Sequence, residues 1–346
     1  MRVNDNMLNV MIKKSPQNPI LTADQVPYKA DCVFNAGVAK INGEYIMVFR
    51  NDYDYISGAA FGGCNLGLAR SKDGIAWEVE KEPILNAEQA REWFADSHDE
   101  RFGLGEIRRV YDPRITVIDG QSYLCAAMDT RHGILGVILK TDDFRSFELL
   151  SLTSPDNRNM VLFPEKIQGK YYRLERPFPV YGRGKAEAFE IWSSASPDLR
   201  YWGDTRLLLG SEEVPYINCK IGPAAPPIRT PKGWLTTIHA VNKDESQLLK
   251  AWGDQKWTKS YYAGLMLLDL ENPQKVIGLS DQPLLIPDAP YEADGFRGSV
   301  IFPGGMILED DGEVKIYYGA ADTCVALATA HVDELIALCK PLPKPE

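Results

Sequence analysis

The sequence predicts an all-β protein, and specifically a five-bladed β-propeller. Two repeated patterns along the chain predict this fold, and the composition agrees with them. The 346 residues include 28 glycines and 23 prolines, which interrupt the chain too often for a helical protein. A two-sheet sandwich is the competing fold, but five similar units in a chain of this length favour the propeller.

The first pattern is a pair of apolar strands joined by a glycine turn. The dipeptides Asn42-Gly43 and Asp119-Gly120 are typical of tight hairpins, because their residues tolerate positive φ. Each hairpin would supply two strands of one blade. The hairpin units occupy residues 38–49, 115–124, 162–172, 227–235 and 306–318.

The second pattern follows a short apolar strand: a hydroxyl residue, an aspartate two positions later and an aromatic residue four positions beyond. Its three copies are Ser71, Asp73 and Trp77; Thr141, Asp143 and Phe147; and Ser196, Asp198 and Trp202. Segments 87–96 and 332–339 are predicted to be short helices outside the sheets. No linker divides the chain, so residues 1–346 are predicted to form a single domain.

Charge and cysteine usage narrow the class of protein. The chain has 38 basic and 48 acidic residues, giving a net charge of −10, so neither nucleic acid nor a membrane is expected as a partner. It has no apolar run long enough to span a membrane, and its start does not resemble a signal peptide. Scattered cysteines without a C-x-x-C pair predict free thiols and a cytoplasmic location. These cysteines are Cys32, Cys64, Cys125, Cys219, Cys324 and Cys339.

A propeller gathers polar residues at the mouth of its central channel, where we expect the active site. Polar residues flank all five hairpin units. Any one of them could equally be a solvated loop charge, but their recurrence at equivalent ends of the repeats favours a shared site. They are Arg50, Asn51, Asp52, Tyr111, Asp112, Arg114, Asp129, Arg158, Arg173, Arg176, Lys220, His239 and Asp322.

Two of these carboxylates are candidates for a role in catalysis or in ligand binding. Asp112 precedes Pro113, and a carboxyl held rigidly beside Tyr111 is expected to have a raised pKa, as a general acid requires. An Asp-Pro turn with an ion pair to Arg114 explains the same residue equally well. Asp322 stands among small residues, which suits either a contact to a hydroxylated ligand or a cap at the end of a strand.

Four basic residues lie next to apolar strands of this acidic protein, and together they would form a phosphate pocket. They are Arg158, Arg176, Lys220 and His239. The sequence has no nucleotide-binding glycine loop and no metal-ligand spacing of histidine or cysteine, so no metal or cofactor is expected. One acid beside a phosphate pocket suggests phosphorolysis of a glycosidic bond, because phosphate is already an anionic nucleophile and needs no general base.

Motifs such as Tyr111-Asp112-Pro113-Arg114 continue along nearly the whole chain. They occupy residues 34–38, 71–77, 111–114, 157–167, 220–228, 233–235, 267–273 and 317–323. In these motifs the sequence resembles glycoside hydrolase family 130, which contains β-mannoside phosphorylases and related hydrolases. The resemblance implies a five-bladed β-propeller, in agreement with the hairpin count.

The resemblance also implies roles for individual residues. Asp112 corresponds to the catalytic acid of the family, which acts on the glycosidic oxygen through the mannose 3-hydroxyl. The residues corresponding to the phosphate-binding set are Arg158, Arg176, Lys220, His239 and Tyr261. Those expected to bind the sugar are Asn51, Asp52, Arg114 and Asp322.

The implied activity is that of an inverting β-mannoside phosphorylase, a hexosyltransferase that releases α-D-mannose 1-phosphate and a shortened acceptor. Inorganic phosphate is then a co-substrate, and the resemblance is also compatible with a homo-oligomer. A hydrolase of the same family and a non-catalytic sugar-binding propeller are the alternatives, and the four basic residues favour phosphorolysis. Segments 52–65 and 248–260 are expected beside the acceptor sugar, whose identity the sequence leaves open.

Overall fold

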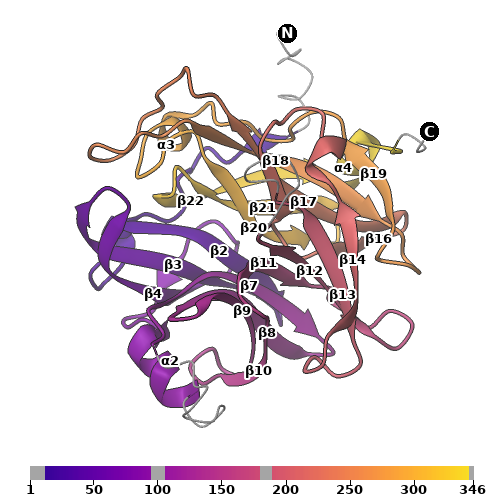
Figure 1. The fold of residues 1–346 in the computed structure, drawn as a ribbon, viewed down its shortest axis with the longest axis horizontal. Helices are drawn as coiled ribbons and strands as arrows, with labels where there is room; N and C mark the ends of the chain where they lie inside the picture. The colour runs from indigo at the N-terminus through magenta and orange to yellow at the C-terminus, as the bar shows by residue number, and fades with distance from the viewer. Residues whose placement is uncertain (1–11, 95–105, 180–188, 343–346) are drawn as a thin grey trace.

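Five antiparallel sheets surround a common centre in the computed structural model, which describes residues 12–94, 106–179 and 189–342 (Figure 1). The sheets are separate rather than paired face to face, so the fold is the predicted five-bladed β-propeller and not a sandwich. Strands β2, β7, β11, β15 and β20 are the first strands of their blades. Contacts of β2 with β7 and β20, and of β11 with β7 and β15, place these strands around the channel.

The first three blades follow the chain in order. Blade 1 contains β2 (Cys32–Ile41), β3 (Glu44–Ser57), β4 (Ala60–Ser71), β5 (Glu78–Val79) and β6 (Leu85–Asn86). Blade 2 contains β7 (Arg109–Ile118), β8 (Gln121–Thr130), β9 (Gly133–Thr141) and β10 (Glu148–Leu152). Blade 3 contains β11 (Asn157–Leu162), β12 (Tyr171–Pro177), β13 (Ile191–Ser196) and β14 (Gly203–Leu209).

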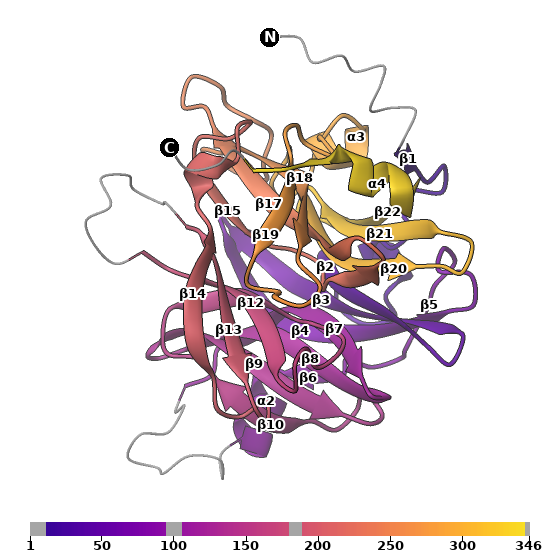
Figure 2. The same ribbon diagram turned by 90° about the vertical axis from the view of Figure 1, so that its right-hand side faces the viewer.

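The last two blades are completed by the two ends of the chain. Blade 4 contains β15 (Lys220–Pro223), β16 (Ile228–Thr230), β17 (Gly233–Lys243), β18 (Lys259–Leu268), β19 (Val276–Ser280) and the C-terminal β23 (Cys339–Lys340). Blade 5 contains β20 (Ile301–Leu308), β21 (Glu313–Ala320), β22 (Cys324–His331) and the N-terminal β1 (Lys13–Lys14). Figure 2 shows β1 near β22, its partner strand, and the Lys14 ammonium anchors β1 to the buried Glu292 carboxylate at 2.6 Å.

All five predicted hairpins are present, with one refinement in blade 4. The hairpin expected at residues 227–235 is formed by β16 and β17, but β15 also pairs with β17. The inner edge of this blade is therefore divided between two short strands. The divided edge places Lys220 at the start of the blade, well before the predicted hairpin.

The second repeated pattern forms the same turn three times. In the first copy, the Ser71 hydroxyl accepts the backbone N–H of Gly74 at 2.8 Å, and Asp73 accepts those of Ile75 and Ala76. Thr141 with Asp143, and Ser196 with Asp198, repeat these bonds. Side chains thus satisfy the backbone where each third strand ends.

The two predicted helices are also present, as α2 (Ala87–Phe94) and α4 (Val332–Leu338). The last two positions of the predicted 87–96 helix lie outside the described residues. A further short helix, α3 (Pro290–Ala293), precedes blade 5. All six cysteines are free thiols, as predicted, and four of them are buried.

A bulge interrupts the inner strand of each of the first three blades near its start. The central residues of the three bulges are Asn35, Asp112 and Asn159, with φ of 49°, 53° and 59°. Asparagine and aspartate adopt this left-handed conformation more readily than other residues with a side chain. Bulges redirect side chains and are frequent beside active sites. The three bulges lie at the same end of the channel, which we call the upper mouth.

Candidate active site

The upper mouth brings together residues from all five blades. Asp112 is central to this group and its carboxylate is 10% exposed. Its Oδ1 accepts hydrogen bonds from Asn35 Nδ2 at 3.0 Å and from Arg50 Nη1 at 3.2 Å. Because Asn35 sits on the equivalent bulge of blade 1, the two bulges hold the carboxylate between neighbouring blades.

The charge state of Asp112 differs from the prediction. Burial acts to raise the pKa of this carboxyl, but the charges of Arg50 and Arg114 and the hydrogen bond from Asn35 outweigh it, so the pKa is lowered. The expected raised pKa is therefore wrong. The sequence placed Tyr111 and Arg114 beside Asp112, but it did not show that the fold also brings Arg50 and Arg158 to this carboxyl.

Asn51 and Asp52 lie one layer behind Asp112. Asp52 is buried and holds Arg50 through two bonds, from Nε at 2.9 Å and from Nη2 at 2.5 Å. Asn51 is fully buried and donates to Lys29 O and Asn65 Oδ1. Asp52 thus orients the arginine that contacts Asp112, and Asn51 fastens the surrounding strands.

Two arginines face each other on blade 3. Arg158 and Arg176 are direct cross-strand partners on β11 and β12, so their side chains share one face of the sheet. Neither forms an ion pair with a carboxylate of the described residues. Arg158 Nε and Arg176 Nε and Nη2 are buried and have no hydrogen-bond partner in the part of the chain that the structure describes. Burial and the charge of Arg158 lower the pKa of Arg176 to about 9, which marks a site that favours an anion.

His239 differs from the predicted cation. It is fully buried, and burial with the charges of Arg176 and Lys220 lowers its pKa well below the usual value. Its Nδ1 donates to Pro223 O at 3.1 Å, which leaves Nε2 to accept from Arg176 Nη1 at 3.0 Å. His239 is therefore neutral and orients Arg176. A Cβ on Gly222 would lie 2.2 Å from His239 Cε1, so glycine is required there.

Aromatic rings surround the cations. The Lys220 ammonium is 5.3 Å from the centre of the Phe189 ring and 5.7 Å from that of Tyr261. Tyr261 is stacked between His239 and Trp257, and burial raises its pKa to about 12. The hydroxyl of Tyr261 is thus protonated at neutral pH and is available as a donor to an anion.

Asp322 lies across the mouth, on blade 5. Burial raises its pKa, and Arg297 opposes this shift from 3.6 Å away. Among the described residues, Arg297 Nε is buried and has no hydrogen-bond partner. The contact of the Asp322 carboxyl with a hydroxylated ligand stays a prediction.

Arg114 is predicted to bind the sugar, but the structure gives it another position. It is 1% exposed, and its guanidinium donates to Ala224 O at 2.6 Å, Pro113 O at 2.8 Å, Asn35 O at 3.3 Å and Pro303 O at 3.4 Å. These carbonyls belong to blades 1, 2, 4 and 5. Because its donors are already occupied, Arg114 ties the inner strands together below the site.

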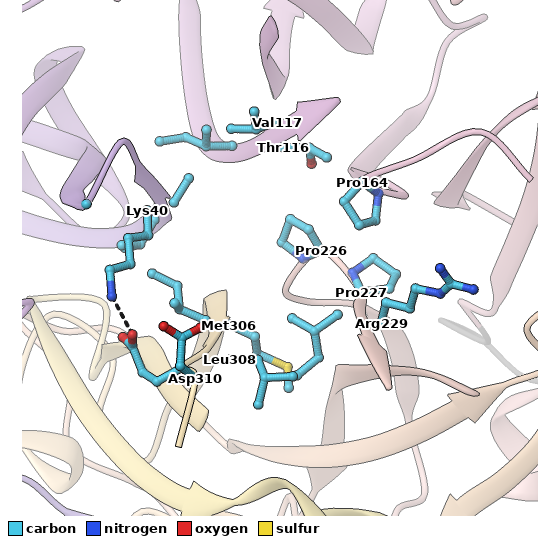
Figure 3. Close-up of a pocket in the computed structure, with 17 residues that line it drawn as sticks. Lys40, Thr116, Val117, Pro164, Pro226, Pro227, Arg229, Met306, Leu308 and Asp310 are labelled. Carbon is cyan, nitrogen blue, oxygen red and sulfur yellow. Dashed lines mark hydrogen bonds and ion pairs between the residues drawn. The ribbon is translucent and has the colours of Figure 1, made fainter. Parts of the chain in front are cut away.

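The other end of the same strands forms a second hollow, which we call the lower mouth. It contains a cavity of about 510 Å³ (Figure 3). Most of its lining residues are apolar, and both of its basic residues are paired, Lys40 with Glu309 and Arg229 with Glu165. The labelled residues that surround it are Lys40, Thr116, Val117, Pro164, Pro226, Pro227, Arg229, Met306, Leu308 and Asp310.

The two segments expected beside the acceptor meet at the rim. Residues 52–65 extend the β3–β4 hairpin, and the 248–260 segment folds back through a bridge between Leu249 and Trp257. Tyr55 and Trp252 pack edge to face, with ring centres 5.4 Å apart. The segments thus form one aromatic wall, while its contact with the acceptor stays a prediction.

The sequence placed Arg50 and Tyr111 at the mouth of the channel without showing their contacts, and Asn35 was not among the predicted site residues. The repeated position of Asn35, Asp112 and Asn159 before the hairpins could have identified Asn35. Arg173, another flanking residue, instead pairs with Glu175 at 3.0 Å. Within residues 12–94, 106–179 and 189–342, no cluster could hold a metal ion and no helix is long and apolar enough to cross a membrane.

A family model and several known proteins are similar to this chain over most of its length. The glycoside hydrolase family 130 model, described as beta-1,4-mannooligosaccharide phosphorylase, matches residues 10–341. A beta-1,2-mannobiose phosphorylase of Listeria innocua is 32% identical over 78% of this chain and 67% of its own. A beta-1,4-mannooligosaccharide phosphorylase of Ruminococcus albus is 32% identical over 93% of this chain and 89% of its own.

A solved structure agrees as well. The beta-1,2-mannobiose phosphorylase of Listeria innocua, in complex with beta-1,2-mannobiose, superposes with a TM-score of 0.77. It is 27% identical in that comparison, which covers 94% of this chain and 98% of the other. The fold and the family match define an enzyme of the glycoside phosphorylase class. The chain belongs to glycoside hydrolase family 130.

Proposed function

We propose that this protein is an inverting β-mannoside phosphorylase. Phosphate attacks C1 of the mannosyl group from the face opposite the leaving oxygen, so one C–O bond forms as the glycosidic bond breaks. The products are α-D-mannose 1-phosphate and a shortened acceptor sugar. The phosphorylase relatives support phosphorolysis of a β-mannoside.

The facing arginines carry this proposal. Two guanidinium groups opposite one another repel, and buried nitrogens without partners are unfavourable. A phosphate dianion between Arg158 and Arg176 would remove both penalties at once. Water would remove neither charge, so the pair favours phosphorolysis over hydrolysis. Lys220 and the Tyr261 hydroxyl complete the proposed pocket, and no cofactor is required.

Asp112 is the proposed general acid, acting through the mannose 3-hydroxyl. It must be protonated to act, whereas Arg50, Arg114 and Arg158 favour its ionised form. A bound phosphate would offset the charge of Arg158 and make protonation of Asp112 easier. The proton then passes to the leaving oxygen as the bond breaks. Asp322 is proposed to hold the mannosyl hydroxyls.

The decisive experiment incubates the protein with β-1,2- and β-1,4-mannobiose in phosphate and in phosphate-free buffer. Release of α-D-mannose 1-phosphate only when phosphate is present is the expected result. Free mannose released equally without phosphate would identify a hydrolase of the family. Binding of mannobiose with no turnover in either buffer would identify a non-catalytic sugar-binding propeller.

A further inference from the structure

A chain of polar contacts leads from the edge of blade 2 to the arginine pair. Arg109 Nε donates to Asp129 Oδ2 at 2.9 Å, and the Tyr111 hydroxyl donates to Asp129 Oδ1 at 2.8 Å. Arg158 Nη1 donates to the same hydroxyl oxygen at 3.3 Å. In this series of contacts, the Tyr111 hydroxyl joins the Asp129 carboxylate to Arg158.

The direction of these hydrogen bonds is fixed by chemistry. Burial raises the pKa of Tyr111, so its hydroxyl keeps its proton. The single proton is directed to Asp129, which is held by Arg109, and the oxygen lone pairs remain for Arg158. With Nη1 fixed in this way, the rotation of the Arg158 fork is limited. Its Nε, which has no partner within residues 12–94, 106–179 and 189–342, remains for a ligand.

The ring of Tyr111 also contacts the acid side of the site. The guanidinium carbons of Arg50 and Arg109 each lie 5.0 Å from the ring centre, within the range of a cation–π contact. Arg50 is the arginine that donates to Asp112. The buried Tyr111 side chain therefore contacts both Arg50, which holds the acid, and Arg158, which is proposed to hold phosphate.

We propose that Tyr111 is a positioning residue for phosphate, whose hydroxyl, held by Asp129, orients Arg158 toward the anion. This inference rests on the proposed phosphorolysis. It assigns Tyr111 an action through Arg158 alone, with no contact to sugar or phosphate. The hydroxyl should therefore affect phosphate binding and leave sugar binding unchanged.

The test is Tyr111→Phe, which removes the hydroxyl and keeps the ring. Loss of one orienting hydrogen bond to a charged group should raise the KM for phosphate about tenfold. The KM for mannobiose should change less than about twofold, since the ring still packs on Arg50. The matched control is Tyr317→Phe, which removes another buried hydroxyl, one that donates to Gly74 O at 2.9 Å. This control should leave both KM values unchanged.

A second variant tests the link to Asp129. Asp129→Ala should also raise the KM for phosphate, but adding it to Tyr111→Phe should change this KM little further, because both act through one hydroxyl. Full additivity would contradict the proposed chain. Equal increases in both KM values, or a Tyr111→Phe enzyme like the Tyr317→Phe control, would overturn the proposal.

Calorimetric titration with inorganic phosphate separates this inference from the proposed function. Wild-type protein that binds phosphate about tenfold more tightly than Tyr111→Phe supports the inference even before turnover is measured. Equal affinity of the two proteins for phosphate would refute the role of Tyr111 alone. Absence of phosphate binding by the wild-type protein would refute both proposals.

Discussion

The two mouths of the channel are lined by the same inner strands but differ in how their charges are paired. At the upper mouth, Arg158 and Arg176 face each other with buried nitrogens that have no hydrogen-bond partner among the described residues. At the lower mouth, the Glu309 carboxylate accepts hydrogen bonds from both Lys40 and Lys315. The basic groups of the lower mouth are thus paired with carboxylates, while the two arginines of the upper mouth are not.

This difference indicates where the fold accommodates a ligand. Unpaired buried polar groups destabilise a protein unless something binds them. The strained backbone of Asn35 and Asp112 lies at the same upper mouth. The lower mouth has the clearer cavity, but its basic residues Lys40 and Arg229 are already paired with carboxylates. Chemistry is therefore expected where the charges are unpaired, and the size of a cavity is the poorer guide.

The largest effect is expected from Asp112→Asn, which would remove the acid from the upper mouth. Turnover of mannobiose should fall by about 10²–10⁴-fold, the usual contribution of a general acid. Binding of mannobiose should persist, because Asn35 and Arg50 remain in place. Release of mannose 1-phosphate and calorimetric binding of the disaccharide measure the two quantities. If the variant kept its turnover, the general acid would have to be another residue, and the proposed difference between the two mouths would be weakened.

An intermediate effect is expected from Met306→Ala at the lower mouth. Met306 is buried in a cluster with Leu235 and Ile316, so its loss should lower the free energy of unfolding by about 2–3 kcal/mol. Both KM values and kcat should stay unchanged. Urea denaturation and steady-state kinetics provide the measurements. A large loss of kcat with unchanged stability would show that the lower mouth takes part in the reaction.

The smallest effect concerns pH and His239. Burial lowers the pKa of this histidine well below 6.5, so below that pH the unfolded chain takes up a proton that the folded protein does not. Stability is therefore lost as pH falls, by up to about 1.4 kcal/mol per pH unit. His239→Gln keeps an acceptor for Arg176 and should show a shallower decline between about pH 6.5 and 5 in urea denaturation. Parallel declines in the two proteins would mean that His239 is protonated in the fold.

The architecture could be predicted because its signals are local. Glycine turns and the serine–aspartate turn of Ser71 and Asp73 specify strand ends within a few residues, and they recur in several blades. The positions of Arg158 and Arg176 came from their place beside apolar strands and from the family resemblance. Neither source showed that the two residues are cross-strand partners.

Charge states could not be predicted because they depend on distant residues. The lowered pKa of Asp112 arises from burial opposed by Arg50, which is 62 positions away. His239 looked like a cation until its enclosure and its bond to Pro223 were known. In the same way, Arg114 stands beside Asp112 in sequence, yet its guanidinium reaches Ala224 on blade 4.

The placement of Arg114 bears on how substrates and products would reach and leave the site. Its guanidinium joins carbonyls from four blades and so lies between the upper and the lower mouth. In the proposed reaction, the substrates and the products would therefore all pass through the upper mouth. The proposal then predicts an ordered kinetic scheme, in which substrates bind and products leave one after another.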